Sequence, residues 1–531
     1  MEPTSNLRAT IGAICYPSGP TDAPRLPLHL DCRVQEGKLP RNTRSIPVPK
    51  ETINMVANGA VVPLIINNES VVTENVFDVH APATGEVLHQ CAAASVDDAN
   101  RAVAAAKAAF PAWSKMKPYH RRDVLMKAAD IMFARAEELI KYQMEETGAG
   151  RMFAEKTYYL GAGFLKDVAA RIPSIEGSVP VTHDAECAMV FKEPYGVILG
   201  IAPWNAPFIL GIRAVALPLA AGNTTVLKGS ELSPKCFWAI GDIFREAGLP
   251  AGCVNVLYHR SADAAEVTTA LIAHPAVRKV NFTGSTQVGS IIGATAGKYI
   301  KPVLLELGGK ASAIVLDDAN LEKAAFCCAL GSFMHSGQVC MSTERIVVQR
   351  AVAGKFRQLL AENSEKLFGK AAPAPVLVAS AAVKKNKALV ADALSKGASV
   401  LFGDANATES SDHSLRPVIV DNVTKDMDLY STESFGPTVS LFVVDTEEDA
   451  IALANDTEYG LTSAVFTDNL FRGLRVAKQI EAGAVHINSL TIHDEPTLPH
   501  GGWKSSGFGR FGGGTAVYDE WLQTKTVTWV Q

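Results

Sequence analysis

Short apolar segments alternate with helical patterns in the middle of this chain, and that alternation limits the folds it can adopt. Residues 197–201, 224–227 and 277–282 look like short buried strands, the first of them wholly apolar, and helical patterns occupy 234–246 and 288–296. Strands that are apolar throughout are typical of parallel sheets covered by helices on both faces. The pattern therefore predicts an α/β fold with a doubly wound sheet, which binds ligands beyond the carboxyl ends of its strands.

The alternation of strand and helix patterns continues toward the C-terminus. A second α/β stretch runs from about 307 to 490, with strand candidates at 313–316, 346–348 and 440–444, and an apolar helix is expected at 322–333. A chain of 531 residues exceeds what one hydrophobic core supports, so two or three domains are expected, with a cleft between them. The final segment, 524–530, alternates like a strand and must pair within the chain or on a neighbouring chain.

The N-terminal region has a different composition. Residues 1–50 hold eight of the 28 prolines and show no sustained period, which predicts an extension with little regular structure. A hairpin is expected at 61–70 and an alanine-rich helix at 97–110.

Composition restricts the kinds of molecule that this protein is expected to bind. A net charge of -5 argues against a nucleic-acid surface, and no apolar run approaches the roughly 20 residues that span a bilayer. The nine cysteines form neither CxxC pairs nor clusters with histidine at zinc spacing, so we expect reduced thiols and no metal site. These observations predict a cytoplasmic protein that acts on a small molecule.

Polar residues follow two of the predicted strands at the ligand-binding edge. Trp204 and Asn205 come after 197–201, and Lys228 and Glu231 come after 224–227. Lys228 and Glu231 are suited to bind the ribose hydroxyls of an adenine dinucleotide, and Glu231 would repel a 2′-phosphate, which favours NAD over NADP. Two structural alternatives stay open: a proline-flanked turn at Trp204, and a solvated charged loop at Lys228 and Glu231.

A third polar segment follows the strand predicted at 277–282. Gly284, Ser285 and Gly289 stand at the start of a helix, where free backbone N–H groups and the helix dipole suit a pyrophosphate. The segment lacks the G-x-G-x-x-G pattern of common dinucleotide-binding folds, and Ser285 is equally suited to be a helix N-cap.

Cys340 and Glu306 are the candidates for covalent chemistry. Glu306 precedes the pair Gly308-Gly309, and Cys340 ends the segment Ser-Gly-Gln-Val-Cys. A thiol and a carboxylate in such settings suggest a nucleophile with a separate general base. The alternative is that Cys340 is a small buried hydrophobe and Glu306 a solvated carboxylate. A thiol hydrolase that pairs Cys340 with His335 or His500 is a rival of another class.

Six motifs in fixed order make the chain resemble the aldehyde dehydrogenase superfamily over roughly residues 60–531. They are PWN at 203–205, KGSE at 228–231, FTGS at 282–285, ELGGK at 306–310, GQVC at 337–340 and ESFGP at 433–437. The resemblance implies an NAD-binding domain at 51–171 and 194–305, a catalytic domain at 306–490, and an oligomerising β-arm at 172–193 and 508–531. A homodimer or homotetramer is implied as well.

The resemblance also implies roles for individual residues. Cys340 is the nucleophile and Glu306 the base, and Asn205, with the backbone N–H of Cys340, stabilises the oxyanion. The other residues that match the family's motifs are implied to contact NAD. Lys228 and Glu231 would contact the adenosine ribose, Trp204 and Ser285 the pyrophosphate region, and Glu433 and Phe435 the nicotinamide ribose.

The segments 204–214, 338–345 (which ends in STER), 492–496 and 509–513 resemble those of salicylaldehyde, benzaldehyde and vanillin dehydrogenases. This resemblance implies an aromatic aldehyde as substrate. Ile209, Leu210 and Arg213 are spaced to face a substrate tunnel, although Arg213 is equally suited to a structural ion pair. His500 stands where such relatives commonly carry an apolar aromatic residue, so a hydroxylated or larger substrate of secondary metabolism is an alternative. An aliphatic aldehyde or semialdehyde is another, and a catalytically idle binding protein is the least favoured. The segment 493–495 is expected to be a structural loop.

Overall fold

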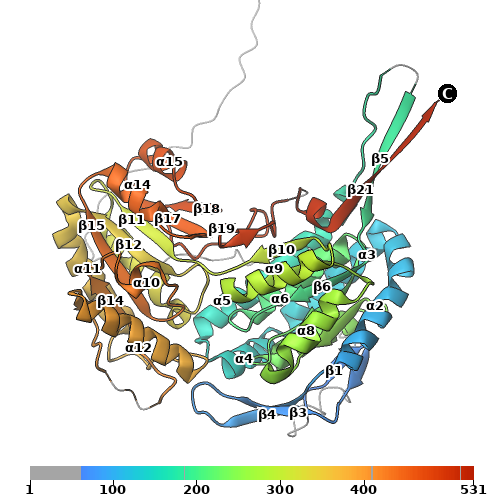
Figure 1. Ribbon diagram of the computed structural model, residues 1–531, viewed down its shortest axis with the longest axis horizontal. Helices are drawn as coiled ribbons and strands as arrows, with labels where there is room; N and C mark the ends of the chain where they lie inside the picture. Colours follow the sequence, from blue (N-terminus) through green and yellow to red (C-terminus); the bar gives the residue numbers. More distant parts are fainter. Residues whose placement is uncertain (1–60, 184–185, 408, 410, 515, 531) are drawn as a thin grey trace, which may run out of the picture. The chain divides into compact units, whose positions relative to one another are not determined.

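Two sheets with parallel centres organise the computed structural model, which describes residues 61–183, 186–407, 409, 411–514 and 516–530 (Figure 1). These residues belong to one compact unit, Ile53–Gln531. The extension predicted at 1–50 lies outside the described residues. The α/β fold expected from the apolar strand pattern is confirmed.

The first sheet has the strand order β2-β1-β8-β7-β6-β9-β10-β20. Its strands β8, β7, β6, β9 and β10 are parallel, whereas β1, β2 and β20 join the two edges antiparallel. Because β7 lies on one side of β6 and β9 on the other, the strand order reverses at β6, where doubly wound sheets bind ligands. The bounds are β1 (Leu64–Ile66), β2 (Glu69–Val71), β6 (Val197–Ile201), β7 (Thr224–Lys228), β8 (Val254–Leu257), β9 (Val277–Thr283), β10 (Val303–Glu306) and β20 (Gly507–Phe508).

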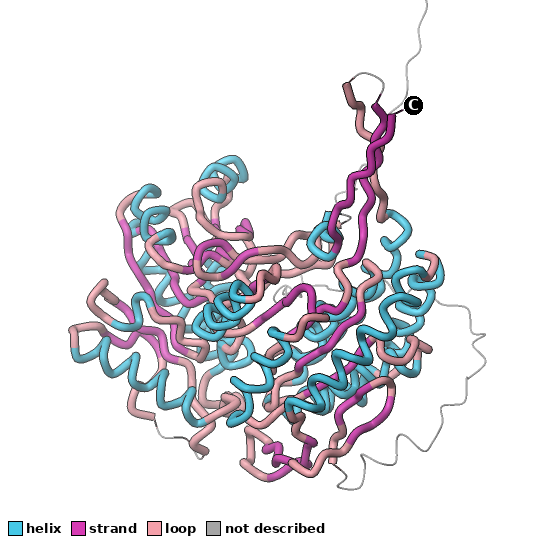
Figure 2. The backbone as a smooth tube through the Cα atoms, turned by 45° about the vertical axis from the view of Figure 1, so that its right-hand side comes forward, coloured by secondary structure: helices cyan, strands magenta, loops and turns pink. Residues whose placement is uncertain are grey.

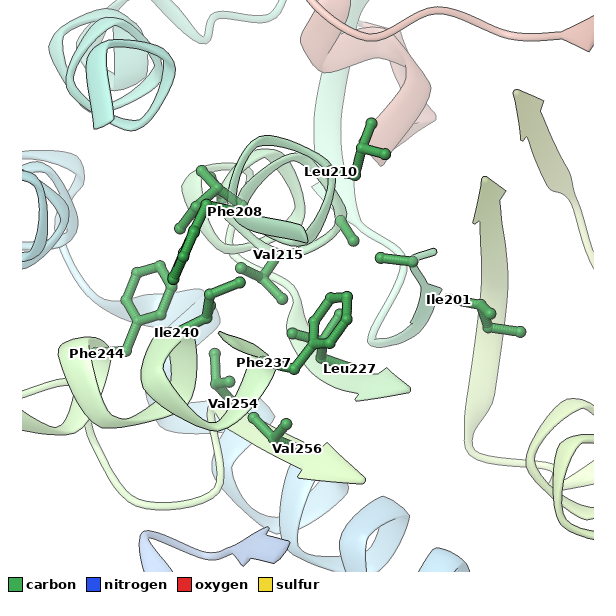
Figure 3. Close-up of a cluster of buried hydrophobic side chains, with 14 of the residues drawn as sticks. Ile201, Phe208, Leu210, Val215, Leu227, Phe237, Ile240, Phe244, Val254 and Val256 are labelled. Atoms are coloured by element: carbon green, nitrogen blue, oxygen red, sulfur yellow. The ribbon is translucent and has the colours of Figure 1, made fainter. Parts of the chain in front are cut away.

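Helices cover this sheet in two groups. One group is α2 (Val96–Lys115), α8 (Ala264–Ala273) and α9 (Thr286–Lys298). The other is α3 (Pro118–Ala134), α4 (Ala136–Thr147), α5 (Arg151–Arg171), α6 (Pro207–Ala220) and α7 (Pro234–Glu246). Every residue of α6 is buried. Figure 3 shows Phe208 and Val215 of α6 facing the apolar residues of α7, while Leu210 lies on another side of the helix.

The second sheet has the strand order β13-β14-β15-β12-β11-β17-β18, with only β13 antiparallel. Successive residues of β12 enter different cores: Ile346 and Val348 pack with α10 and α11, and Val347 packs on the opposite face with α12, α14 and α15. The alternation explains why the segment 346–348 of β12 is apolar without a break. The strands are β11 (Ala311–Val315), β12 (Thr343–Gln349), β13 (Ser399–Phe402), β14 (Val418–Asp421), β15 (Thr438–Val444), β17 (Thr462–Phe466) and β18 (Ala484–Ile487).

The helices of this half are α10 (Leu321–Phe333), α11 (Arg350–Phe368), α12 (Ser380–Ser395), α13 (Asp428–Ser431), α14 (Glu447–Asn455) and α15 (Leu470–Ala477). Cys327 and Cys328 of α10 are buried in the core, as expected for packing residues. Among the residues that the structure describes, every cysteine carries a free thiol, and no helix is long and apolar enough to cross a membrane.

The predicted C-terminal strand pairs within the chain. β21 (Leu522–Val530) runs antiparallel to β5 (Glu186–Pro194) through nine residue pairs, from Leu522 with Pro194 to Val530 with Glu186. Figures 1 and 2 show the two strands side by side as a ribbon that extends away from the sheets. Two other pairs complete the strands: β3 (Val76–His80) with β4 (Val87–Ala92), and β16 (Tyr459–Gly460) with β19 (Trp503–Lys504).

Candidate active site

Cys340 and Glu306 lie next to each other, although they come from different sheets. Glu306 is the last residue of β10, and Cys340 lies in the turn that leads into β12. The Cys340 Sγ is 4.0 Å from the Glu306 Oε1. Cys340 is half-buried, whereas Glu306 is 1% exposed, so the alternative of a solvated carboxylate is excluded.

Two glycines after Glu306 allow this approach. A Cβ on Gly309 would lie 2.4 Å from the carbonyl oxygen of Cys340, and one on Gly308 would lie 2.5 Å from the Glu433 Oε2. The Gly309 N–H donates to the Glu433 Oε1 at 2.8 Å. Any side chain at Gly309 would push the thiol away from Glu306, because the contact is with backbone and cannot be relieved by a rotamer change.

We expect Gly309→Ala to lower turnover by about 100-fold, because a displacement of about 1 Å at a reacting centre costs on that order. Gly354→Ala is the matched control: Gly354 lies within α11, and a Cβ there meets nothing within 4 Å. The control should keep full activity and gain up to about 1 kcal/mol in the free energy of unfolding. Steady-state assays and thermal unfolding measure both, and equal activity of the two variants would contradict this account of the glycine.

Three groups hold the Glu306 carboxylate. His500 Nε2 is 2.8 Å from Oε1, the Thr283 hydroxyl donates to Oε2 at 3.2 Å, and Arg213 Nη1 is 3.8 Å from Oε2. Burial raises the pKa of Glu306, but the charge and hydrogen bond of His500, the charge of Arg213 and the Thr283 hydroxyl together lower it to about 2. Glu306 is therefore a carboxylate at any working pH in this arrangement.

Arg213 is held by a second carboxylate. Its guanidinium pairs with Asp494, and the side chains of both residues are buried. The ion pair that the sequence left open for Arg213 is confirmed. The expectation that 493–495 is only a structural loop is incomplete, because Asp494 joins a buried cluster of charges with Arg213, His500 and Glu306.

The Cys340 thiol is protonated in this arrangement. Burial and the charges of Glu306 and Glu433 raise its pKa well above the ordinary value, and Arg213 opposes them only in part. The chemistry predicted from the sequence needs a thiolate near neutral pH. A base or an added positive charge must therefore act on the thiol when the reaction begins.

Asn205 reaches the loop of the nucleophile. It is 4% exposed and follows β6, and its Nδ2 donates to the carbonyl of Gln338 at 3.1 Å. A carboxamide nitrogen has two N–H groups, so one remains for an oxyanion that forms at Cys340.

Lys228 and Glu231 lie together at the carboxyl end of β7. Lys228 Nζ is 3.9 Å from the Glu231 Oε2, and the Ser261 hydroxyl donates to the Glu231 Oε1 at 3.2 Å. A cavity of about 390 Å³ adjoins Glu231 and is also lined by Leu232, Glu146, Val378, His413 and residues of the β3–β4 hairpin. Both side chains are partly buried, which disfavours the alternative of a fully solvated loop.

The segment after β9 has a structural role that is visible in its contacts. Ser285 is the N-cap of α9, and its hydroxyl accepts from the backbone N–H of Val288 at 3.4 Å. A Cβ on Gly289 would lie 2.3 Å from Leu307, so this glycine lets α9 pack against the loop after Glu306. Ser285 therefore acts as the N-cap of α9, and its exposed side chain lies at the start of the helix.

Trp204, Phe435 and Glu433 line another side of the site. The rings of Trp204 and Phe435 meet edge to face, with centroids 6.1 Å apart. Burial and the charge of Glu344 raise the pKa of Glu433 to about 7. A ligand that donates hydrogen bonds would favour its ionised form.

One buried ion pair near the site was not predicted from the sequence. Lys310 Nζ lies 2.7 Å from the Glu344 Oε2, and Glu344 accepts from the backbone N–H groups of Ser434 and Phe435. The pair joins the loops that carry Glu306, Cys340 and Glu433. Both residues lie in the conspicuous segments ELGGK and STER, but a motif cannot reveal which of its charges are paired.

His335 does not serve the thiol. Neither of its ring nitrogens has a hydrogen-bond partner, and the ring stacks on Phe153 with centroids 4.5 Å apart. Burial lowers the pKa of His335 to about 3. His500, the other candidate of the hydrolase hypothesis, is bound to Glu306. Neither histidine therefore forms the Cys-His pair that this hypothesis needs.

Comparisons with known proteins identify similar sequences and structures. The model of the aldehyde dehydrogenase family matches residues 68–527. A vanillin dehydrogenase from Pseudomonas fluorescens is 45% identical over 475 residues, which are 88% of this chain and 97% of the relative.

Solved structures are similar over the same range. A salicylaldehyde dehydrogenase from Pseudomonas putida G7, complexed with salicylaldehyde, has a TM-score of 0.85 and 38% identity, with 88% of this chain and 98% of that chain covered. A betaine aldehyde dehydrogenase from Staphylococcus aureus in complex with NAD+ has a TM-score of 0.83 and 29% identity, with 88% and 94% covered.

Proposed function

Since this chain belongs to the aldehyde dehydrogenase family, we propose that it oxidises an aromatic aldehyde to the carboxylic acid with NAD. The observation that carries the proposal is the 4.0 Å approach of the Cys340 Sγ to the Glu306 Oε1 beside the Asn205 amide. This set offers a nucleophile, a base and an oxyanion donor at one point.

The first half of the reaction uses Cys340 and Asn205. The Cys340 thiol gives its proton to a nearby base, and the thiolate that results attacks the aldehyde carbon. The oxyanion of the thiohemiacetal is held by the Asn205 Nδ2–H and the backbone N–H of Cys340, and removal of one such donor typically costs about 10²–10³ in rate. Loss of hydride from this adduct leaves a thioester on Cys340.

The second half uses Glu306. The carboxylate accepts a proton from water, and the resulting hydroxide attacks the thioester carbon. The carbon–sulfur bond breaks, the acid leaves, and the Cys340 thiolate takes the proton back from Glu306. Cys340 and Glu306 thus act in successive steps. A separation of 4.0 Å leaves room for this division, which needs no short hydrogen bond between them.

A nicotinamide dinucleotide supplies the hydride acceptor and, as a cation, favours the thiolate. The donor set suits it: Lys228 and Glu231, beside a cavity of about 390 Å³, would hold the ribose hydroxyls of the adenosine. Trp204, Gly284, Ser285 and Gly289 would line the pyrophosphate side, and Glu433 with Phe435 the second ribose. The first sheet would then serve as the dinucleotide-binding domain and the second as the catalytic domain.

Glu231 supports NAD over NADP, because a 2′-phosphate would face its carboxylate. We expect Glu231→Gln to lower the NAD-to-NADP ratio of kcat/KM by about tenfold, the effect of about 1.4 kcal/mol of relieved repulsion. The amide keeps an oxygen for Ser261. Glu266→Gln removes the same charge from an exposed site in the first turn of α8 and should leave the ratio unchanged. An unchanged ratio in Glu231→Gln would argue against this source of selectivity.

Arg213 bears on the class of aldehyde. A semialdehyde needs a cation for its distal carboxylate, but the Arg213 guanidinium is already neutralised by Asp494 and lies near Glu306. Ile209 and Leu210, the neighbouring tunnel candidates on α6, are apolar and buried. An apolar wall supports an aromatic ring over a carboxylate-bearing chain.

The proposed function is tested by NADH absorbance with vanillin, salicylaldehyde, benzaldehyde, a short aliphatic aldehyde and succinic semialdehyde as substrates. We expect kcat/KM to be highest for an aromatic aldehyde. Highest kcat/KM for the semialdehyde would overturn the substrate class, and acid production without NAD would overturn the reaction.

The β5–β21 ribbon supports a homo-oligomer. It exposes apolar side chains, including Phe191, Trp529 and Val530, and a two-stranded ribbon is marginally stable alone. We propose that it pairs with a second copy in a dimer or tetramer in the cytoplasm. Light scattering after size-exclusion chromatography measures the assembly, and a monomer at micromolar concentration would contradict the proposal.

A further inference from the structure

His500 occupies an unusual place for an ionisable side chain. It is 7% exposed, and its Nε2 lies 2.8 Å from the Glu306 Oε1, the same oxygen that lies 4.0 Å from the Cys340 Sγ. An ionised carboxylate only accepts hydrogen bonds, so the Nε2 must carry the proton of this contact. The ring thus holds the oxygen that faces the nucleophile.

The other side of the ring is held as well. Nδ1 is 3.8 Å from the Asp494 Oδ1, and the backbone of His500 pairs with Phe511 through two hydrogen bonds. Two further ionisable side chains lie near the ring. Arg213 from α6 pairs with Asp494. The pKa of His486, from β18, is lowered by its burial and by the charges of His493 and His500. His500 therefore stands between two carboxylates and is fixed by its strand-like backbone.

Building on the proposed function, we propose that His500 is a positioning residue for Glu306: its Nε2–H keeps the carboxylate ionised and oriented toward the thioester on Cys340. Glu306 is 1% exposed, and burial alone favours the protonated acid, which cannot accept a proton from water. Thr283 and Arg213 hold only the other oxygen, Oε2. Among the contacts of the described residues, the one other donor to Oε1 is the Cys340 thiol at 4.0 Å, and it has no proton to donate once the sulfur carries the acyl group.

The role predicts a defect in one half of the reaction. Hydride transfer precedes the use of Glu306, so the NADH burst should survive the loss of His500, while hydrolysis should slow. The sign of the pH effect follows from the low pKa of Glu306. The charge and hydrogen bond of His500 are the largest causes that lower this pKa, so their loss raises it, and the ionised fraction of Glu306 falls at acidic pH. The hydrolytic defect should be largest at low pH and shrink as pH rises.

The test compares His500→Phe, which removes the donor, with His500→Gln, which restores a neutral N–H donor. Rapid mixing with aldehyde and excess NAD separates the burst from steady turnover, over the pH range in which each protein keeps its thermal unfolding midpoint. His120→Gln, which alters an exposed histidine of α3, is the control and should leave both phases unchanged.

We expect His500→Phe to keep the burst rate within about threefold, to lose at least tenfold in steady turnover at pH 6.5, and to shift the acid limb of turnover upward. His500→Gln should recover most of the turnover at pH 9 while keeping the shifted acid limb, because the amide orients Glu306 without a charge. If His500→Phe does not fold, this shift in His500→Gln decides the question.

Two results would overturn the inference. One is full steady turnover in both folded variants, together with an acid limb of turnover at the same pH as in the unaltered enzyme. The other is an equal fall of burst and steady turnover, which would assign His500 to aldehyde or thiol binding instead. Both differ from failure of the proposed function, in which the unaltered enzyme forms no NADH with any aldehyde.

Discussion

Cys340→Ala is expected to lose NADH formation by roughly 10⁴-fold or more, because no covalent adduct can form and an aldehyde carbon does not release hydride readily. The loss must include the burst, since every later step depends on the thiohemiacetal. The fold should survive, because Cys340 is half-buried in a turn and its side chain is not part of a hydrophobic core. Stopped-flow absorbance and thermal unfolding measure the two effects.

Cys328→Ala is the matched control. Cys328 is 1% exposed in the core of α10, and burial raises the pKa of its thiol well above the ordinary value. We expect full turnover and a loss of about 1 kcal/mol in the free energy of unfolding, the reverse of Cys340→Ala. Wild-type turnover in Cys340→Ala would refute the covalent mechanism, whatever the control shows.

The parallel centres of both sheets were predictable from local sequence. Strand β6 is wholly apolar and buried because helices cover both faces, so burial leaves a continuous signal there, whereas β9 also carries Arg278 and Lys279. The antiparallel edge strand β20 has two residues, Gly507 and Phe508, and such a segment carries no period. Its pairing with β10 depends on tertiary contacts.

The site also has one part that local sequence predicts and another that only packing reveals. Cys340, Glu306 and Asn205 stand in motifs whose chemistry is local, and the structure brings all three together. The charges around Glu306 could not be predicted, because Arg213 and His500 are far apart in the chain and each is plausible as an isolated structural residue. Only packing shows that they share one carboxylate, and that burial and the charges of Glu306 and Glu433 raise the pKa of the Cys340 thiol.

Glu306→Gln is expected to separate the two halves of the reaction. The amide cannot accept a proton from water, so the thioester should accumulate, with an NADH burst near one equivalent per site and steady turnover lower by about 10²–10⁴-fold. The change also leaves the buried charge of Arg213 with only Asp494 and removes the carboxylate that His500 binds. We therefore expect a lower unfolding midpoint, which must be measured so that assays stay below it.

The control for charge alone is Glu322→Gln, which removes an exposed carboxylate from the first turn of α10 and should leave both phases unchanged. Mass spectrometry of quenched Glu306→Gln should find the acyl group on Cys340, because hydrolysis and not hydride transfer is then the slow step. A linear progress curve at the wild-type rate would show that another group activates the water. Loss of the burst together with turnover would instead place Glu306 in the first half of the reaction, as the acceptor of the Cys340 proton 4.0 Å away.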